Sequence, residues 1–155
     1  MFQNNRILLL INNEVLMRYL REHLIVEGGY SIVFESTAQS ALSAMKQDSF
    51  DLIIVGVDIP GFEGAAIVKE IRKADPDAII IVFSEAMDYD LMEQASSLGI
   101  YDFVSKPINQ EKLFFLIRKG IERHSLVVTH HRLVSILKEQ NTALQKQNII
   151  LAKRV

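Results

Sequence analysis

Residues 50–64 read FDLIIVGVDIPGFEG, and this stretch decides the fold. Its centre, residues 52–57, consists of aliphatic residues and one glycine, and it is too short for a helix but long enough for a strand. Polar and apolar residues do not alternate within it, so both faces of the strand are expected to be buried. Burial on both faces is typical of a parallel sheet that is covered by helices on each side.

Four further segments are predicted strands. Residues 7–11 and 78–83 are continuous apolar runs, residues 101–104 form a weaker run, and residues 31–35 alternate as in a half-buried strand. Segments with apolar residues at helical spacing lie between the strands. The strict alternation of strand and helix predicts a doubly wound α/β domain with a parallel sheet and right-handed crossovers.

The predicted helices have recognisable ends. Thr37, Asp88 and Asn109 are predicted N-caps, because their side-chain oxygens can accept hydrogen bonds from the free amide groups of a first helical turn. Gly28-Gly29 is predicted to close the first helix and Asp75-Pro76 the third. The connections are therefore short, as expected for one compact domain.

The composition excludes several classes of function. The 155 residues carry a formal net charge of -2 and no cysteine, which excludes disulfides, thiolate metal sites and cysteine nucleophiles. There is neither a basic face nor a helix-turn-helix pattern, so nucleic acid is not an expected partner of this chain. No apolar stretch is long enough to span a bilayer and no signal peptide is recognisable, so we expect a cytoplasmic protein without a membrane partner.

The candidate site residues lie where the predicted strands end. Ligands of open α/β sheets collect at the carboxyl ends of the strands, near the point where the strand order reverses. The residues found at these ends are Asn12, Asn13, Gly56, Asp58, Ser84, Lys106 and Pro107.

Three of these features, taken in order along the chain, resemble the receiver domains of response regulators in two-component signalling. They are the stretch 50–64, the hydroxyl of Ser84 and the segment VSKP at residues 104–107. The resemblance covers about residues 6–123. It implies a flavodoxin-like sheet of five parallel strands in the order 2-1-3-4-5. It also implies that Phe103 stands at the aromatic switch position of the family.

The sequence departs from the receiver pattern at the positions that carry its chemistry. Receivers place two acidic residues after the first strand to hold Mg²⁺, whereas this chain has Asn12 and Asn13. They place the phosphorylated aspartate at the end of the third strand, whereas this chain has Gly56, which offers no carboxylate. Neutral amides substitute poorly for carboxylates around Mg²⁺, and Lys106 alone does not make the reaction. We therefore expect a degenerate pseudo-receiver that is not an enzyme, has no cofactor and binds Mg²⁺ weakly or not at all.

Two alternatives stand beside this interpretation. Asp58 lies two residues past Gly56, so on a continuing strand it would project to the same side and act as a surrogate acceptor. Its other role is that of a turn residue before Pro60-Gly61. A small ligand could instead occupy the vacated pocket, where Asn12 and Asn13 offer hydrogen-bonding groups, although no glycine-rich phosphate loop supports it.

Residues 124–155 contain no proline or glycine and fit a heptad repeat. The a positions are Val127, Val134, Asn141 and Asn148, and the d positions are His130, Leu137, Leu144 and Leu151. Leucine at d with valine and asparagine at a favours a parallel two-stranded coiled coil, in which the asparagines fix register and partner number. Leu126 and Leu133 fall at g and would widen the seam. The alternative is a solvated amphipathic helix that folds back on the domain.

We accordingly expect a receiver domain over residues 1–123 and a coiled-coil extension over residues 124–155 that leads into an output domain. The expected function is that of a signalling module that forms homodimers through its C-terminal helix and docks other signalling proteins. By resemblance, the docking face is built from the fourth helix, the fifth strand and the fifth helix.

Overall fold

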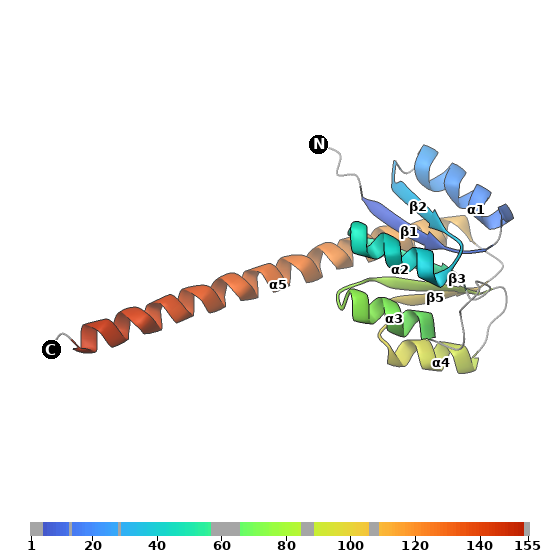
Figure 1. Cartoon of the computed structure of the whole chain (residues 1–155). Coiled ribbons are helices and arrows are strands. Elements are labelled where there is room, and N and C mark those ends of the chain that lie inside the picture. Colours follow the sequence, from blue (N-terminus) through green and yellow to red (C-terminus); the bar gives the residue numbers. More distant parts are fainter. Residues whose placement is uncertain are drawn as a thin grey trace. The chain divides into compact units, whose positions relative to one another are not determined.

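A computed structural model describes residues 5–12, 14–27, 29–56, 66–84, 89–105 and 109–153. Its five strands form one parallel sheet in the order β2-β1-β3-β4-β5 (Figure 1). The strands are β1 (Arg6–Leu10), β2 (Ser31–Glu35), β3 (Leu52–Gly56), β4 (Ile80–Ser84) and β5 (Asp102–Ser105). The predicted fold class and strand order are confirmed.

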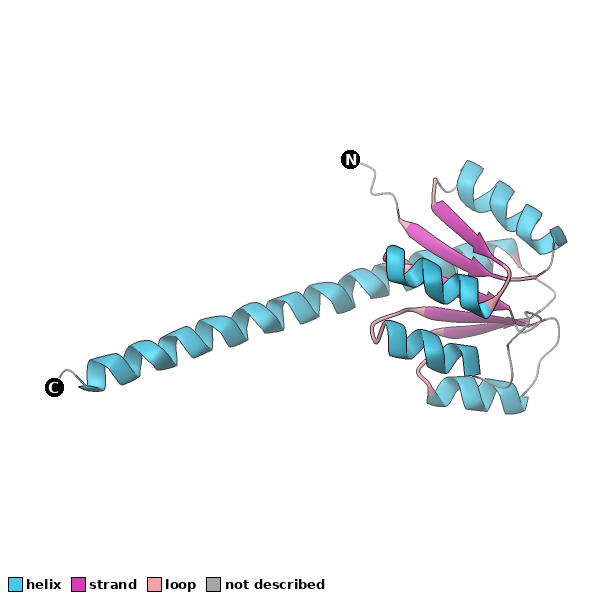
Figure 2. Ribbon diagram, viewed as in Figure 1, coloured by secondary structure: helices cyan, strands magenta, loops and turns pink. Residues whose placement is uncertain are grey.

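Each of the five strands is followed by a helical segment, as Figure 2 shows by its alternation of cyan and magenta elements. They are α1 (Glu14–Leu20), η1 (Arg21–Glu27), α2 (Ala38–Gln47), α3 (Ala66–Ala74), α4 (Tyr89–Ser97) and α5 (Gln110–Lys153). η1 is a π-helical continuation of α1. The long C-terminal helix expected from the sequence is therefore present as α5.

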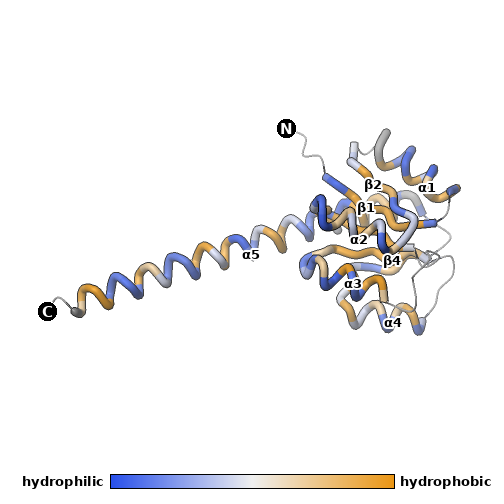
Figure 3. The backbone as a smooth tube through the Cα atoms, viewed as in Figure 1, coloured by the Kyte–Doolittle hydropathy of each residue, from blue (hydrophilic) through white to orange (hydrophobic). Residues whose placement is uncertain are grey.

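The two faces of the sheet bury alternate residues of each strand. Ile7 and Leu9 of β1 belong to one core cluster, whereas Leu8 and Leu10 belong to the other. The first cluster is completed by buried residues of α1, η1 and the start of α5, and the second by residues of α2, α3 and α4. This is the burial on both faces that the apolar strands predict, and Figure 3 shows these strands mostly in orange.

The fourth strand starts later than its sequence predicts. Ala78 and Ile79 are buried, but the strand begins only at Ile80. The amide of Ala78 donates to the carbonyl of Asp75 at 3.2 Å and so belongs to the turn after α3. The apolar run marks burial here, and the turn hydrogen bond decides where the strand begins.

Two of the three predicted N-caps are confirmed. The Oγ1 of Thr37 accepts a hydrogen bond from the amide of Ser40 at 3.1 Å, and the Oδ1 of Asn109 accepts from Lys112 at 3.3 Å. The third, Asp88, lies outside the described residues.

The start of α5 approaches the sheet closely because it carries a glycine. An added Cβ at Gly120 would lie 2.9 Å from Cδ1 of Leu52 and 3.4 Å from Cγ2 of Ile79. Leu113, Leu116 and Ile117 of the same helix are buried in the core. This part of α5 is thus an integral layer of the domain.

The contacts within the chain separate it into two units, Met1–His124 and Ser125–Val155. The first contains the sheet and its helices. The second contains α5 from Ser125 to Lys153. Among the helices that the structure describes, none combines the length and the apolar character that crossing a membrane requires.

One arginine joins α3 to two connections of the first unit. The guanidinium of Arg72 on α3 donates to the carbonyls of Pro76 and Ala78, at 2.8 and 2.7 Å, before β4. It also donates to the carbonyls of Leu98 and Gly99, at 3.3 and 2.8 Å, where α4 ends. Gly99 has a φ of +76°, so the chain turns there in the left-handed region that glycine favours. Arg72 therefore satisfies carbonyl groups that the end of a helix leaves free.

We expect Arg72→Met to lower the free energy of unfolding by about 2–3 kcal/mol, because hydrogen bonds from a charged donor contribute about 1.5–3 kcal/mol. The matched control is Lys73→Met, whose ammonium makes an exposed pair with Glu70 at 3.6 Å and should change stability by less than about 0.5 kcal/mol. Urea unfolding followed by circular dichroism, at one protein concentration for all variants, measures both. Equal stability of the two variants would contradict this role of Arg72.

Candidate functional site

The crevice at the carboxyl ends of β1 and β3 is the candidate site. Strand order reverses between these two strands, because β2 and β4 lie on opposite sides of the pair. In open α/β sheets this reversal point is where ligands bind. Leu10 is the register partner of Val55, so the residues that follow each of them meet at the same edge.

On the β1 side the described residue is Asn12. It follows Ile11, which is buried, and it is itself exposed. A side-chain amide at this position can donate and accept hydrogen bonds but carries no charge. Asn13 lies outside the described residues, and α1 begins at Glu14, whose side chain is exposed.

On the β3 side the site is formed by Gly56. This residue is the last of β3, is buried, and pairs in register with Phe83 of β4. The position at the end of the central strand therefore offers backbone atoms and no side chain.

Ser84 and Phe103 lie on the neighbouring strands. Ser84 is the last residue of β4, pairs in register with Ser105 of β5, and is 6% exposed. Phe103 of β5 is 8% exposed and packs in the core cluster of α2, α3 and α4. The structure thus places a hydroxyl and a buried aromatic ring on the strands beyond Gly56.

The remaining predicted pocket residues are Asp58, Lys106 and Pro107. All three lie outside the described residues. The structure therefore brings Gly56 and Ser84 to the ends of adjacent strands, and it leaves the positions of the other three untested.

Among the predicted site residues that the structure describes, none offers a carboxylate for Mg²⁺. Asn12, Gly56 and Ser84 supply an amide, backbone groups and a hydroxyl, whereas Mg²⁺ in protein sites is usually held by carboxylates together with water and substrate oxygens. Within the described part of the chain, no three or more side chains of histidine, aspartate or glutamate gather to form a metal site.

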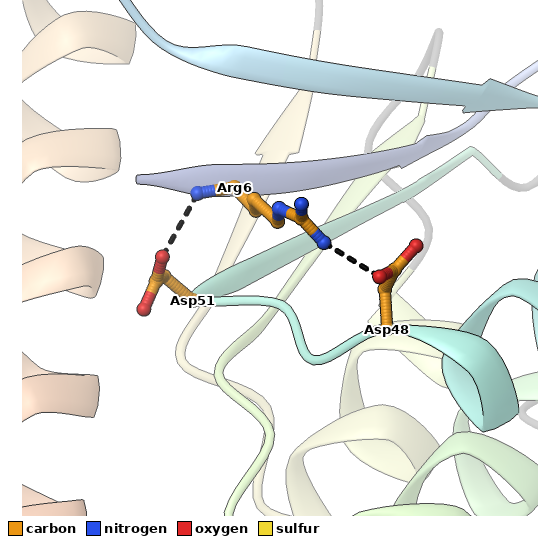
Figure 4. Close-up of polar contacts among 3 residues, drawn as sticks. All are labelled: Arg6, Asp48 and Asp51. Atoms are coloured by element: carbon orange, nitrogen blue, oxygen red, sulfur yellow. Dashed lines mark hydrogen bonds and ion pairs between the residues drawn. The ribbon is translucent and has the colours of Figure 1, made fainter. Parts of the chain in front are cut away.

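The opposite edge of the sheet carries a polar network that was not predicted from the sequence. The amide of Arg6 donates to Oδ2 of Asp51 at 2.8 Å, and the guanidinium of Arg6 donates to Oδ1 of Asp48 at 2.7 Å (Figure 4). Oδ1 of Asp51 also lies 3.3 Å from Nδ1 of His124 on α5. Asp51, which directly precedes β3, thus links the start of β1 to the end of the first unit.

The two pairs of this network differ in solvent exposure. The side chains of Arg6 and Asp48 are 48% and 49% exposed, and such a surface pair contributes little to stability. His124 is only 13% exposed and Asp51 33%. The sequence did carry a signal for the contact between Arg6 and Asp51. Arg6 begins the first strand, Asp51 directly precedes the third, and these two strands are neighbours in the order 2-1-3.

A cavity of about 340 Å³ lies away from the predicted site. It is formed where α2 ends, where the chain enters β3 and where α3 ends. Its lining residues are Met45, Lys46, Gln47, Asp48, Ser49, Phe50, Ile53, Ala74 and Asp75. None of the predicted site residues is among them.

The residues of the predicted seam lie in the second unit on α5. Leu137, Leu144 and Leu151 are 63%, 58% and 59% exposed. Val127 and Val134 are partly exposed, and His130, Asn141 and Asn148 are exposed. Figure 3 shows hydrophobic and hydrophilic stretches following each other along this helix.

Comparison with known proteins gives a family match. The sequence model of the response regulator receiver domain matches residues 8–118. The chemotaxis protein CheY of Thermotoga maritima is 28% identical over 112 residues, which are 72% of this chain and 93% of CheY. The transport regulator DctD of Rhizobium meliloti is 27% identical over 124 residues, which are 80% of this chain but 27% of DctD.

Solved structures agree with this match. The signal receiver domain of an HD domain-containing protein from Pseudomonas fluorescens Pf-5 is 25% identical and superposes with a TM-score of 0.77. The superposition covers 83% of this chain and 95% of that domain. The match over residues 8–118 and the five-stranded sheet together establish that this chain belongs to the response regulator receiver domain family of two-component signalling.

Proposed function

We propose that this chain is a pseudo-receiver, a signalling module that forms no acyl phosphate and acts by homodimerisation and by docking other signalling proteins. The observation that carries the proposal is Gly56 at the end of β3, buried and without a side chain. Receiver domains are in general signalling modules rather than enzymes, so loss of the acceptor leaves the fold available for protein contacts.

The metal-binding side of the site supports the same proposal. A phosphoryl group in transfer carries negative charge that a metal ion normally stabilises. Asn12 and Asn13 stand where the family has acidic residues, and two amides add no negative charge to attract Mg²⁺. The acceptor and both metal carboxylates are therefore missing together, which is harder to compensate than a single substitution.

Two other functions would use different residues of the site. Asp58 can act as an acceptor only if its carboxylate reaches the place vacated at Gly56, since phosphoryl transfer depends strongly on geometry. A ligand sensor would use the amide of Asn12 and the hydroxyl of Ser84 as its polar contacts.

The C-terminal helix supports the dimer. Leucines occur at three of its four d positions and are more than half exposed within a single chain. A periodic apolar stripe of this kind is stabilised when it is covered by a second helix. Val127 and Val134 at a and the asparagines at positions 141 and 148 favour a coiled coil of two parallel helices.

Incubation with acetyl phosphate and Mg²⁺ should leave the intact mass of the protein unchanged, because no carboxylate stands at the acceptor position. The comparison variant combines Asn12→Asp, Asn13→Asp and Gly56→Asp, and it should gain the mass of one phosphoryl group in a Mg²⁺-dependent manner. A stoichiometric, labile phosphoryl adduct on the unmodified chain that disappears in Asp58→Asn would establish the surrogate acceptor instead.

Replacement of one seam leucine should weaken the dimer. Leu137→Lys removes an apolar d side chain from both copies and places two ammonium groups in the seam, and we expect at least a ~100-fold weaker association. The matched control is Ile136→Lys at the neighbouring c position, where the side chain is 42% exposed and lies off the a/d seam. Sedimentation equilibrium measures both dissociation constants, and equal values would exclude the a/d dimer.

A further inference from the structure

Between residues 126 and 151, the lysine, arginine and glutamate side chains are confined to one side of the helix. In the a/d heptad frame, lysine, arginine and glutamate between residues 126 and 151 occur only at e and f. They are Arg132, Lys138, Glu139 and Lys146. The arc formed by positions c, g, d and a, roughly 160° wide, carries none of them. This arc is wider than the stripe that a single two-stranded seam uses.

The wide arc contains a second heptad seam. The first seam joins positions a and d. The second joins d and g, and its residues are Leu126, His130, Leu133, Leu137, Gln140, Leu144, Gln147 and Leu151. Their spacing alternates between four and three residues, which is the spacing of an a/d repeat. The two seams share His130 and the three leucines at d.

Neither seam is covered within its own chain. Leu126 and Leu133, which belong only to the second seam, are 65% and 54% exposed. α5 runs without interruption from Gln110 to Lys153, so both seams extend over the same turns.

The residues that belong to only one seam are similar in number and polarity in the two seams. The first seam has two valines and two asparagines, and the second has two leucines and two glutamines at the neighbouring positions. Leucine buries more apolar surface than valine, which favours the second seam. Asparagine at a is the better-adapted polar residue of a two-stranded coil, which favours the first. These preferences oppose each other, so neither seam has a large advantage.

A second copy of this chain is the occupant that fits both seams. A side-chain amide donates and accepts hydrogen bonds, so identical amides that face each other across a two-fold axis satisfy one another. Between residues 126 and 151, no lysine, arginine, aspartate or glutamate would be buried in either arrangement, because those present lie at e and f.

We propose that the homodimer alternates between the two seams by a rotation of roughly 50–60° of each helix about its own axis. This inference rests on the dimer proposed above. The d leucines remain in the contact throughout, and the g and a residues exchange places. The seams begin shortly after His124, whose contact with Asp51 ties this end of the first unit to β3. A two-state helix pair of this kind carries a signal when one state is favoured over the other.

Disulfide cross-linking of the full chain tests the proposal, because the protein has no cysteine of its own. Leu133→Cys reports the second seam, Val134→Cys the first, Leu137→Cys both, and Glu139→Cys at f neither. Only cysteines whose Cα atoms approach within about 7 Å can be bridged. On mild oxidation we expect cross-linked dimers from the first three variants and none from Glu139→Cys.

Two background variants bias the equilibrium in opposite directions. Gln140→Leu with Gln147→Leu makes the second seam more apolar, and Asn141→Leu with Asn148→Leu does the same for the first. The cross-linking yield of Leu133→Cys relative to Val134→Cys should rise at least about tenfold in the first background, which corresponds to ~1.4 kcal/mol, and fall by a similar factor in the second.

The outcomes separate this inference from the proposed dimer. A dimer by sedimentation that cross-links at Leu137→Cys, but whose yield ratio is the same in both backgrounds, retains the dimer and overturns the two seams. A trimer or tetramer also overturns them, because both seams would then be buried at once. A monomer that does not cross-link at Leu137→Cys refutes the dimer and the two seams together.

Discussion

The central position of β3, with a paired strand on each side and helices over both faces, is the constraint on which the rest of this structure depends. All five of its residues are buried, with β1 on one side and β4 on the other. A strand in this position must be covered by helices above and below, and the chain supplies them from α1, η1 and the start of α5 on one face and from α2, α3 and α4 on the other. The same packing brings the carboxyl ends of β1 and β3 together, and it brings their amino ends together around Asp51.

The two ends of the strands differ in the polar contacts that the structure describes. At the carboxyl ends of the strands, the described residues include the buried Gly56 of β3 and the charged Glu35 of β2. A glycine fills the end of β3 without disturbing the core, because the strand is held by backbone pairing and by apolar neighbours. The charged contacts lie at the amino edge, between Asp51, Arg6 and His124. Under the proposed function, the domain keeps the fold of its family without the phosphoryl chemistry.

Under the proposed function, the second unit rather than the pocket makes the contacts that transmit the signal. The helix beyond His124 presents apolar side chains that its own chain does not cover, and their period matches that of a helix partner. An apolar arc wider than one seam gives such a partner more than one way to bind. Regulation through a choice of seam requires no acceptor carboxylate, so it is compatible with the function proposed for this chain.

The sequence by itself determined the features that depend on local periodicity and local hydrogen bonds. These patterns predicted the strand at residues 31–35, the N-caps at Thr37 and Asn109 and the parallel α/β class. They also predicted that Gly56 and Ser84 lie where the third and fourth strands end. Only the tertiary structure decided which strand ends become neighbours. The contacts of Asp51 with Arg6 and His124, and those of Arg72 with the end of α4, join residues far apart in the chain, and they exist only because packing of the layers brings these residues together.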